Sequence, residues 1–163
     1  MTERREIVVK VADLVVEQGD AVLVTWGLGS CVAMMLLEPH AQAAGMAHVL
    51  LPSPSLSREA GSPGKFPQTA LPELLARLRG VGADPGRVVA KLVGGSTMFA
   101  NLLSPGTVHM GERNVLSCRS TLRQAGIPIV AEDVGGGLGR SVWLEANSGR
   151  VTIRSVGQDD RIL

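Results

Sequence analysis

Apolar residues in the first third of the chain form short runs that are separated by turns. The run EIVVKVADLVV, residues 6–16, is rich in β-branched side chains, and EQGD supplies a turn before AVLVT, residues 21–25. β-branched runs bounded by turn residues are typical of strands. We therefore predict one strand over residues 6–16 and a second strand over residues 21–25.

Two more apolar runs follow a Gly-Leu-Gly-Ser turn, and the spacer PHAQAAG separates them. CVAMMLLE, residues 31–38, predicts a third strand, although its pattern is also compatible with a short helix at Cys31. MAHVLL, residues 46–51, predicts a fourth strand. If these strands pair in antiparallel order, the far ends of the hairpin meet, and Cys31 and His48 come within side-chain reach. The pattern does not determine the register.

Helical spacing of apolar residues begins near the middle of the chain. Four leucines between residues 71 and 78 recur at i, i+3, i+4 and i+7, which predicts a helix over residues 69–79. A second apolar stripe predicts a helix that begins near residue 112 or 113 and ends at residue 126. Cys118 belongs to this stripe, so we expect it to pack in the core as a small apolar residue.

The remaining apolar runs complete a mixed pattern of strands and helices. Residues 87–93 and 127–133 are expected to form strands, and segments 140–146 and 150–155 face each other across an Asn-Ser-Gly turn, which is a hairpin signal. The chain has no internal repeat and no break in composition that would separate domains. We therefore predict that residues 1–163 form one α+β domain.

One long segment has no periodicity. Residues 52–68, PSPSLSREAGSPGKFPQ, contain four prolines and four serines and follow the strand that carries His48. Loops of this length are commonly functional or mobile. Two interpretations stay open, a lid or substrate-docking loop and a surface insertion without regular structure.

Composition and charge argue against several classes of function. The 163 residues include 16 Lys and Arg against 15 Asp and Glu, with only two tryptophans and two phenylalanines, so nothing favours a nucleic-acid partner. The longest apolar runs are far shorter than the roughly 18 to 20 residues that cross a bilayer, so no membrane insertion is expected. The N-terminus, MTERREIVV, lacks the features of a signal peptide. The expected location is the cytosol, where the two cysteines would remain reduced.

The candidate chemistry centres on Cys31 and His48. A thiol with its ordinary pKa of about 8.5 is mostly protonated at neutral pH, so a nucleophilic cysteine requires activation. An imidazole can accept the thiol proton, and a third polar group commonly fixes the imidazole tautomer. Thr25, just before the glycine turn, is a candidate for that place. The backbone N–H groups of Gly29, Ser30 and Cys31 are candidates for an oxyanion hole, and such a site would perform acyl transfer.

Other interpretations of the same residues stay open. A lone cysteine beside an apolar run is usually a buried core residue, and a lone histidine in a strand is often structural. A zinc site is less favoured, because Cys31, His48 and His40 lack the paired ligands of zinc sites. Ser30 as the nucleophile lacks the G-x-S-x-G frame, and no Lys-Ser or Lys-Thr follows the glycines as in a phosphate loop.

Five short motifs carry a resemblance that spans nearly the whole chain. They are TWGLGSCVAMMLLEP around Cys31, GMAHVLLP around His48, AKLVGGSTMF at residues 90–99, MGERN at residues 110–114, and EDVGGGLGR at residues 132–140. In this order they resemble the CheD family, the chemoreceptor glutamine deamidases of bacterial and archaeal chemotaxis. The resemblance implies an α+β fold in which mixed β-sheets are layered with two or three helices, similar to the fold of cysteine-dependent toxin deamidases.

The same resemblance implies a reaction and the residues that perform it. Cys31 looks like the nucleophile, His48 the general base and Thr25 the third member of the site. The implied reaction is hydrolysis of glutamine side-chain amides in the cytoplasmic helices of a chemoreceptor, with no cofactor and no metal. The family also binds a CheC-type phosphatase of the response regulator. A docking role that needs no catalysis is therefore the alternative.

Several other motif residues have more than one interpretation. Trp26, beside the glycine turn, is expected to be a packing residue, and a wall of the substrate groove is the alternative. Residues 112–114 are expected to be capping and ion-pair residues at a helix start rather than substrate contacts. The glycines at 94–95 and 135–137 are expected to allow backbone crossings near the site, and Arg140 is expected to be structural.

Overall fold

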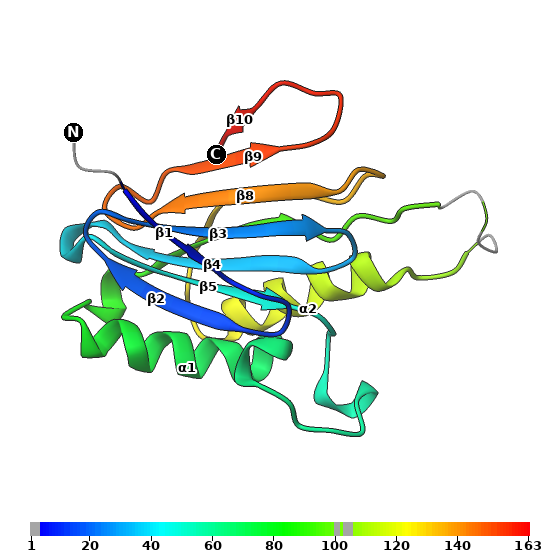
Figure 1. Ribbon diagram of the computed structural model, residues 1–163. Helices are drawn as coiled ribbons and strands as arrows, with labels where there is room; N and C mark the ends of the chain where they lie inside the picture. The colour runs from blue at the N-terminus through cyan, green and yellow to red at the C-terminus, as the bar shows by residue number, and fades with distance from the viewer. Residues whose placement is uncertain (1–3, 100–101, 103–105) are drawn as a thin grey trace.

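The computed structural model describes residues 4–99, 102 and 106–163. In this part of the chain, two five-stranded sheets pack face to face, and two helices cover the outer face of one of them (Figure 1). The first sheet contains, in spatial order, β1 (Arg5–Val8), β3 (Ala21–Leu28), β8 (Arg140–Glu145), β9 (Val151–Arg154) and β10 (Arg161–Ile162). The second sheet contains, in spatial order, β2 (Leu14–Gln18), β5 (Ala43–Val49), β4 (Val32–Glu38), β6 (Val89–Gly94) and β7 (Ile129–Val134).

The helices pack on the second sheet. They are α1 (Pro67–Gly80) and α2 (Met110–Gln124), and short 3₁₀ turns are formed by η1 (Pro39–Ala41), η2 (Pro54–Leu56), η3 (Pro63–Lys65) and η4 (Pro85–Arg87). Helix α1 lies against β5 and β2, and α2 lies against β4, β6 and β7. None of the helices within the described ranges is long and apolar enough to cross a membrane.

Strand β4 is buried along its whole length because its two faces meet different partners. Its even-numbered residues from Val32 to Leu36 pack under the helices, and its odd-numbered residues from Ala33 to Leu37, with Cys31 just before the strand, pack between the two sheets. A strand that is covered on both faces has no polar alternation, which accounts for the continuous apolar run CVAMMLLE. The prediction of a strand here is confirmed, and the alternative short helix does not form.

The predicted single strand over residues 6–16 is wrong, because this segment forms two strands in different sheets. β1 pairs in parallel with β3, whereas β2 pairs antiparallel with β5. Between them, Ala12 has a positive φ of 66°, and the N–H of Asp13 donates to the carbonyl of Lys10 to close a turn. Both halves of the segment are apolar, so hydrophobicity alone does not show where the chain changes sheet.

The other elements differ from the predictions mainly at their ends. Helix α1 begins at Pro67, where a proline fits the first helical turn, and α2 begins at Met110, earlier than expected. The predicted strands at residues 87–93 and 127–133 form as β6 and β7 with shifted ends, and the closing hairpin forms as the antiparallel pair β8 and β9. Strand β10 was not predicted.

The segment between β5 and α1 is less irregular than expected. The last two residues of the predicted loop over residues 52–68 belong to α1, and the rest of it contains the turns η2 and η3. The carbonyl of Lys65 accepts hydrogen bonds from the N–H groups of Leu50 and Leu51, which ties the end of this segment back to β5. A lid or docking role for it stays a prediction. The single α+β domain with mixed sheets and two helices is confirmed.

Candidate active site

The pairing of β4 with β5 places Cys31 and His48 on the same face of the second sheet. The two strands are antiparallel, with Ala33 opposite His48 and Val32 opposite Val49. Cys31 lies two residues before Ala33, so its side chain points to the same side as that of Ala33 and is diagonal to His48. This side faces the first sheet. The antiparallel pairing predicted for these two segments is therefore confirmed, and a direct contact between Cys31 and His48 stays a prediction.

Thr25 reaches this face from the opposite sheet. It lies on β3, is 1% exposed, and its Oγ1 is 2.7 Å from Nδ1 of His48, which is also 1% exposed. The Thr25 hydroxyl also donates to the carbonyl of Val9, at 2.7 Å. A hydroxyl has one proton to donate, so with its proton on Val9 it must accept from Nδ1–H of His48. The contact therefore belongs to the tautomer that leaves Nε2 unprotonated.

Nε2 is the ring nitrogen that remains available for chemistry. It is buried and has no hydrogen-bond partner among the described residues. An imidazole nitrogen with a free lone pair is the group that a general base requires. The arrangement thus holds one nitrogen of His48 against the first sheet and leaves the other free on the face that Cys31 shares.

Burial keeps both members of the pair uncharged. It raises the pKa of the Cys31 thiol above its ordinary value, an effect that the backbone N–H of Cys31 partly offsets. It lowers the pKa of His48, and the carbonyl of Val9 partly offsets this change. At neutral pH the resting state is therefore a thiol beside a neutral imidazole. Such a pair acts only when the imidazole takes the thiol proton during the reaction.

The turn that carries Cys31 is held from behind by the segment after β6. The N–H and the hydroxyl of Ser96 both donate to the carbonyl of Gly29, at 2.9 and 2.7 Å. The N–H of Gly95 donates to the carbonyl of Cys31 at 2.8 Å. Gly94 has a φ of 118°, and a Cβ on it would lie 2.3 Å from the carbonyl oxygen of Cys31. Only glycine fits this crossing, as expected for the Gly94-Gly95 pair.

Arg140 supports the same crossing from the other side. Its guanidinium donates to the carbonyls of Gly94 and Gly135 and to the carboxylate of Asp133. Arg161 binds the second oxygen of Asp133, and the two guanidinium groups hold the pKa of that carboxyl below its ordinary value, although its burial acts in the opposite direction. The structural role predicted for Arg140 agrees with these contacts.

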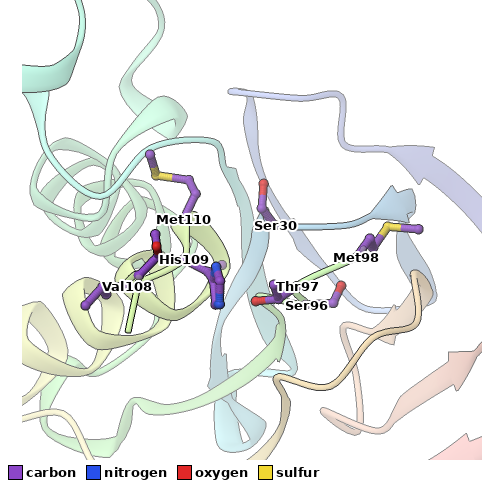
Figure 2. A pocket seen from close by; sticks show the side chains of 9 residues that line it. Ser30, Ser96, Thr97, Met98, Val108, His109 and Met110 are labelled. Atoms are coloured by element: carbon purple, nitrogen blue, oxygen red, sulfur yellow. The ribbon is translucent and has the colours of Figure 1, made fainter. Parts of the chain in front are cut away.

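A pocket of about 460 Å³ opens beside the turn that precedes Cys31. Figure 2 shows Ser30 and Met98 on one side of it and His109 and Met110, at the start of α2, on the other. Met98 is 45% exposed, and Trp26, close to the same turn, is 53% exposed. About half of the Trp26 side chain is therefore in contact with solvent, and its packing role stays a prediction.

Cys118 and His40 lie away from this pair. Cys118 is fully buried in the core under the helices, where burial strongly raises its pKa, so the prediction that it is a core residue is confirmed. His40 lies in η1, beyond the far end of β4 from Cys31. Within the described part of the chain, no group of His, Cys, Asp or Glu side chains is arranged to hold a metal ion.

Reasoning from the sequence missed several groups around the site. The carbonyl of Val9 accepts a hydrogen bond from the Thr25 hydroxyl. The side chains of Ser96 and Asn114 donate to the carbonyls of Gly29 and Ser30, in the turn before Cys31. Both side chains belong to motifs of the family resemblance, but the sequence predicts residues 112–114 to be capping and ion-pair residues at a helix start. Asn114 instead lies inside α2 and is 0% exposed.

The chain is similar to known proteins over most of its length. A family model described as CheD chemotactic sensory transduction matches residues 50–155. A protein of Caldanaerobacter subterraneus subsp. tengcongensis, named probable chemoreceptor glutamine deamidase CheD, is 36% identical over 155 residues, which are 95% of this chain and 96% of that protein. A protein of the same name from Pyrococcus abyssi is 40% identical over 152 residues, 93% of each chain. Among solved structures, the hypothetical protein YfiH of Bacillus licheniformis aligns with a TM-score of 0.43 and 13% identity, over 80% of this chain and 59% of that one.

Proposed function

This chain belongs to the CheD family, and we propose that it hydrolyses the side-chain amide of glutamine residues in chemoreceptors to glutamate. The names of its relatives supply the substrate class. One observation supports the assignment of particular residues to this reaction. The hydrogen bond between Thr25 and Nδ1 of His48 leaves Nε2 free on the face that Cys31 shares. We assign Cys31 as the nucleophile, His48 as the general base and Thr25 as the residue that fixes its tautomer.

The first half of the reaction releases ammonia. Nε2 of His48 takes the proton of the Cys31 thiol as Sγ attacks the carboxamide carbon, and a C–S bond forms. Negative charge then develops on the carboxamide oxygen, where backbone N–H groups of the turn at Gly29 and Ser30 and of Cys31 stabilise it. His48 returns the proton to the amide nitrogen, the C–N bond breaks, and ammonia leaves.

The second half restores the enzyme. A water molecule attacks the thioester carbon while Nε2 of His48 takes one of its protons, and the C–S bond breaks. The thiol is reprotonated, and the glutamine has become a glutamate. The receptor gains one negative charge at each modified position. We place this reaction in the cytoplasm, on the cytoplasmic helices of the receptor.

A direct assay tests this function. Incubation of the protein with a soluble cytoplasmic fragment of a chemoreceptor that carries glutamines should release ammonia. The fragment should gain about one dalton per modified site, because NH₂ is replaced by OH. Mass spectrometry of its peptides locates each site. A fragment that keeps its mass, with no ammonia above the level without enzyme, would contradict the proposal.

The uncharged resting pair predicts a particular pH dependence. We expect the rate of alkylation of Cys31 by iodoacetamide to rise about tenfold per pH unit between about pH 6 and pH 8, because the thiolate is the reactive form and its pKa is raised. The acid limb of kcat/KM should lie below about pH 6.5, because the lowered pKa of His48 keeps the base unprotonated to lower pH. An alkylation rate that is already constant below pH 7 would instead indicate a preformed thiolate.

The family resemblance also predicts docking of a CheC-type phosphatase. None of the contacts described above favours that role over catalysis, and docking does not require the hydrogen bond between Thr25 and His48. It stays a prediction of the resemblance.

A further inference from the structure

Asn114 joins the nucleophile turn to the strand that carries His48. Its Nδ2 group donates to the carbonyl of Ser30 at 2.9 Å and to the carbonyl of Leu50 at 3.1 Å. Ser30 immediately precedes Cys31, and Leu50 lies two residues after His48. One amide group thus uses both of its protons to connect the two segments that carry the proposed nucleophile and base.

This bridge lies where the ladder between β4 and β5 ends. The last residue pair of the ladder is Val32 with Val49, and the next N–H along β5, that of Leu50, donates to Lys65 instead. The pairing between β4 and β5 therefore does not continue as far as Cys31. Asn114 supplies the link between the two segments at the position where the proposed chemistry takes place.

The contact with Ser30 also determines where the N–H of Cys31 points. In a planar trans peptide, the carbonyl of one residue and the N–H of the next point in opposite directions. Because the Ser30 carbonyl is directed at α2, the Cys31 N–H is directed away from α2. Among the described residues, neither Ser30 nor Cys31 donates its N–H in a backbone–backbone hydrogen bond. No backbone carbonyl therefore competes with a developing oxyanion for these two groups.

The side chain of Asn114 is unusual for a residue that only fills the core. It is 0% exposed, and its Oδ1 has no hydrogen-bond partner among the described residues. An unpaired buried carbonyl is destabilising, and an aliphatic side chain of similar size would avoid this cost. The observation is explained if the amide is present for the two hydrogen bonds that Nδ2 donates.

We propose that Asn114 is a positioning residue for the deamidation reaction. By holding the carbonyls of Ser30 and Leu50 together, it aims the N–H of Cys31 at the oxygen of the tetrahedral intermediate. This inference rests on the proposed function and extends it, because it names the group that orders the oxyanion hole. In this proposal α2 contributes to the reaction through Asn114, which positions the backbone near Cys31 but does not contact the substrate.

The test compares Asn114→Leu with the wild-type protein. On a chemoreceptor fragment, the variant should have a kcat that is about 10- to 100-fold lower, with KM little changed, because a misaimed oxyanion donor weakens only the transition state. Alkylation of Cys31 by iodoacetamide should keep the wild-type rate, because that reaction forms no oxyanion. A purely structural role would not separate the two rates.

Ser117→Ala is the matched control. Ser117 also lies on α2 and donates to a backbone carbonyl, that of Pro52, at 2.6 Å, but it does not contact the nucleophile turn. This variant should keep the wild-type kcat. Circular dichroism and thermal unfolding establish that each variant is folded, and Asn114→Ala replaces Asn114→Leu if the larger apolar side chain prevents folding.

Each outcome supports or overturns the inference. A folded Asn114 variant with wild-type kcat overturns it, and so does a variant in which deamidation and alkylation fall in parallel. Failure of both Asn114 variants to fold would assign the residue to the core alone. If the wild-type protein releases no ammonia, the proposed function fails and this inference fails with it. If only the Asn114 variants behave as wild type, the inference fails alone.

Discussion

Replacement of Cys31 by serine is expected to abolish ammonia release from a chemoreceptor fragment, with a loss in kcat/KM of at least about 10⁴-fold. The hydroxyl of serine is a far weaker acid than a thiol, and burial lowers the pKa of His48, so transfer of the serine proton to Nε2 is much less favourable than transfer of the thiol proton. Sulfur and oxygen differ little in size, so the fold should be retained. Ammonia release and the mass of the fragment measure the effect.

Cys118 provides the control for this prediction. It is 0% exposed in the core under the helices, and its pKa is strongly raised by burial, so it has no thiolate to contribute at neutral pH. Cys118→Ala should keep the wild-type rate while it lowers the free energy of unfolding by about 1 kcal/mol, similar to the loss of one buried methyl group. Substantial activity in Cys31→Ser, or its loss in Cys118→Ala, would contradict the assignment of the nucleophile.

Replacement of Thr25 by valine should lower kcat by about 10²- to 10³-fold, because it removes the acceptor that holds the proton on Nδ1 of His48. Without that acceptor the proton can move to Nε2, and the nitrogen that faces Cys31 is then no longer a base. Valine has nearly the shape of threonine, so packing should change little. The variant also leaves the carbonyl of Val9 without its donor and should be less stable by about 1 to 3 kcal/mol.

The readout for Thr25 includes the tautomer itself. The ¹⁵N chemical shifts of the His48 ring should show Nε2 unprotonated in the wild-type protein and partly protonated in Thr25→Val. Thr25→Ser keeps a hydroxyl with the same donor and acceptor and should restore most of the rate. A Thr25→Val variant with the wild-type rate and tautomer would remove Thr25 from the site.

Local patterns were sufficient for most individual elements. The strand at CVAMMLLE, the helix rich in leucine and the hairpin across Asn-Ser-Gly were all predicted, because strand and helix periods and turn residues act over a few neighbouring positions. The segment EIVVKVADLVV was misinterpreted as one strand for the same reason. Nothing in its apolar pattern distinguishes one long strand from two short strands that belong to different sheets.

The proposed site was predicted unevenly. Cys31 was predicted as a candidate because it directly follows the Gly-Leu-Gly-Ser turn, and His48 because it lies in the next predicted strand. Thr25 was predicted from its place before the turn and from the family resemblance. Asn114 was recognised only as part of a helix start. Its true position, inside α2 with both amide protons on distant carbonyls, depends on where α2 begins and on which carbonyls face it.

Residue order alone was therefore enough to locate most of the elements, the candidate site residues Cys31 and His48 and the glycines at 94 and 95, since these features depend on short stretches of chain. The register of β4 against β5, the approach of Thr25 from the other sheet and the link through Asn114 required the folded protein. These contacts join segments that are far apart in the chain, and their geometry follows from packing two sheets and two helices together, which no local pattern specifies.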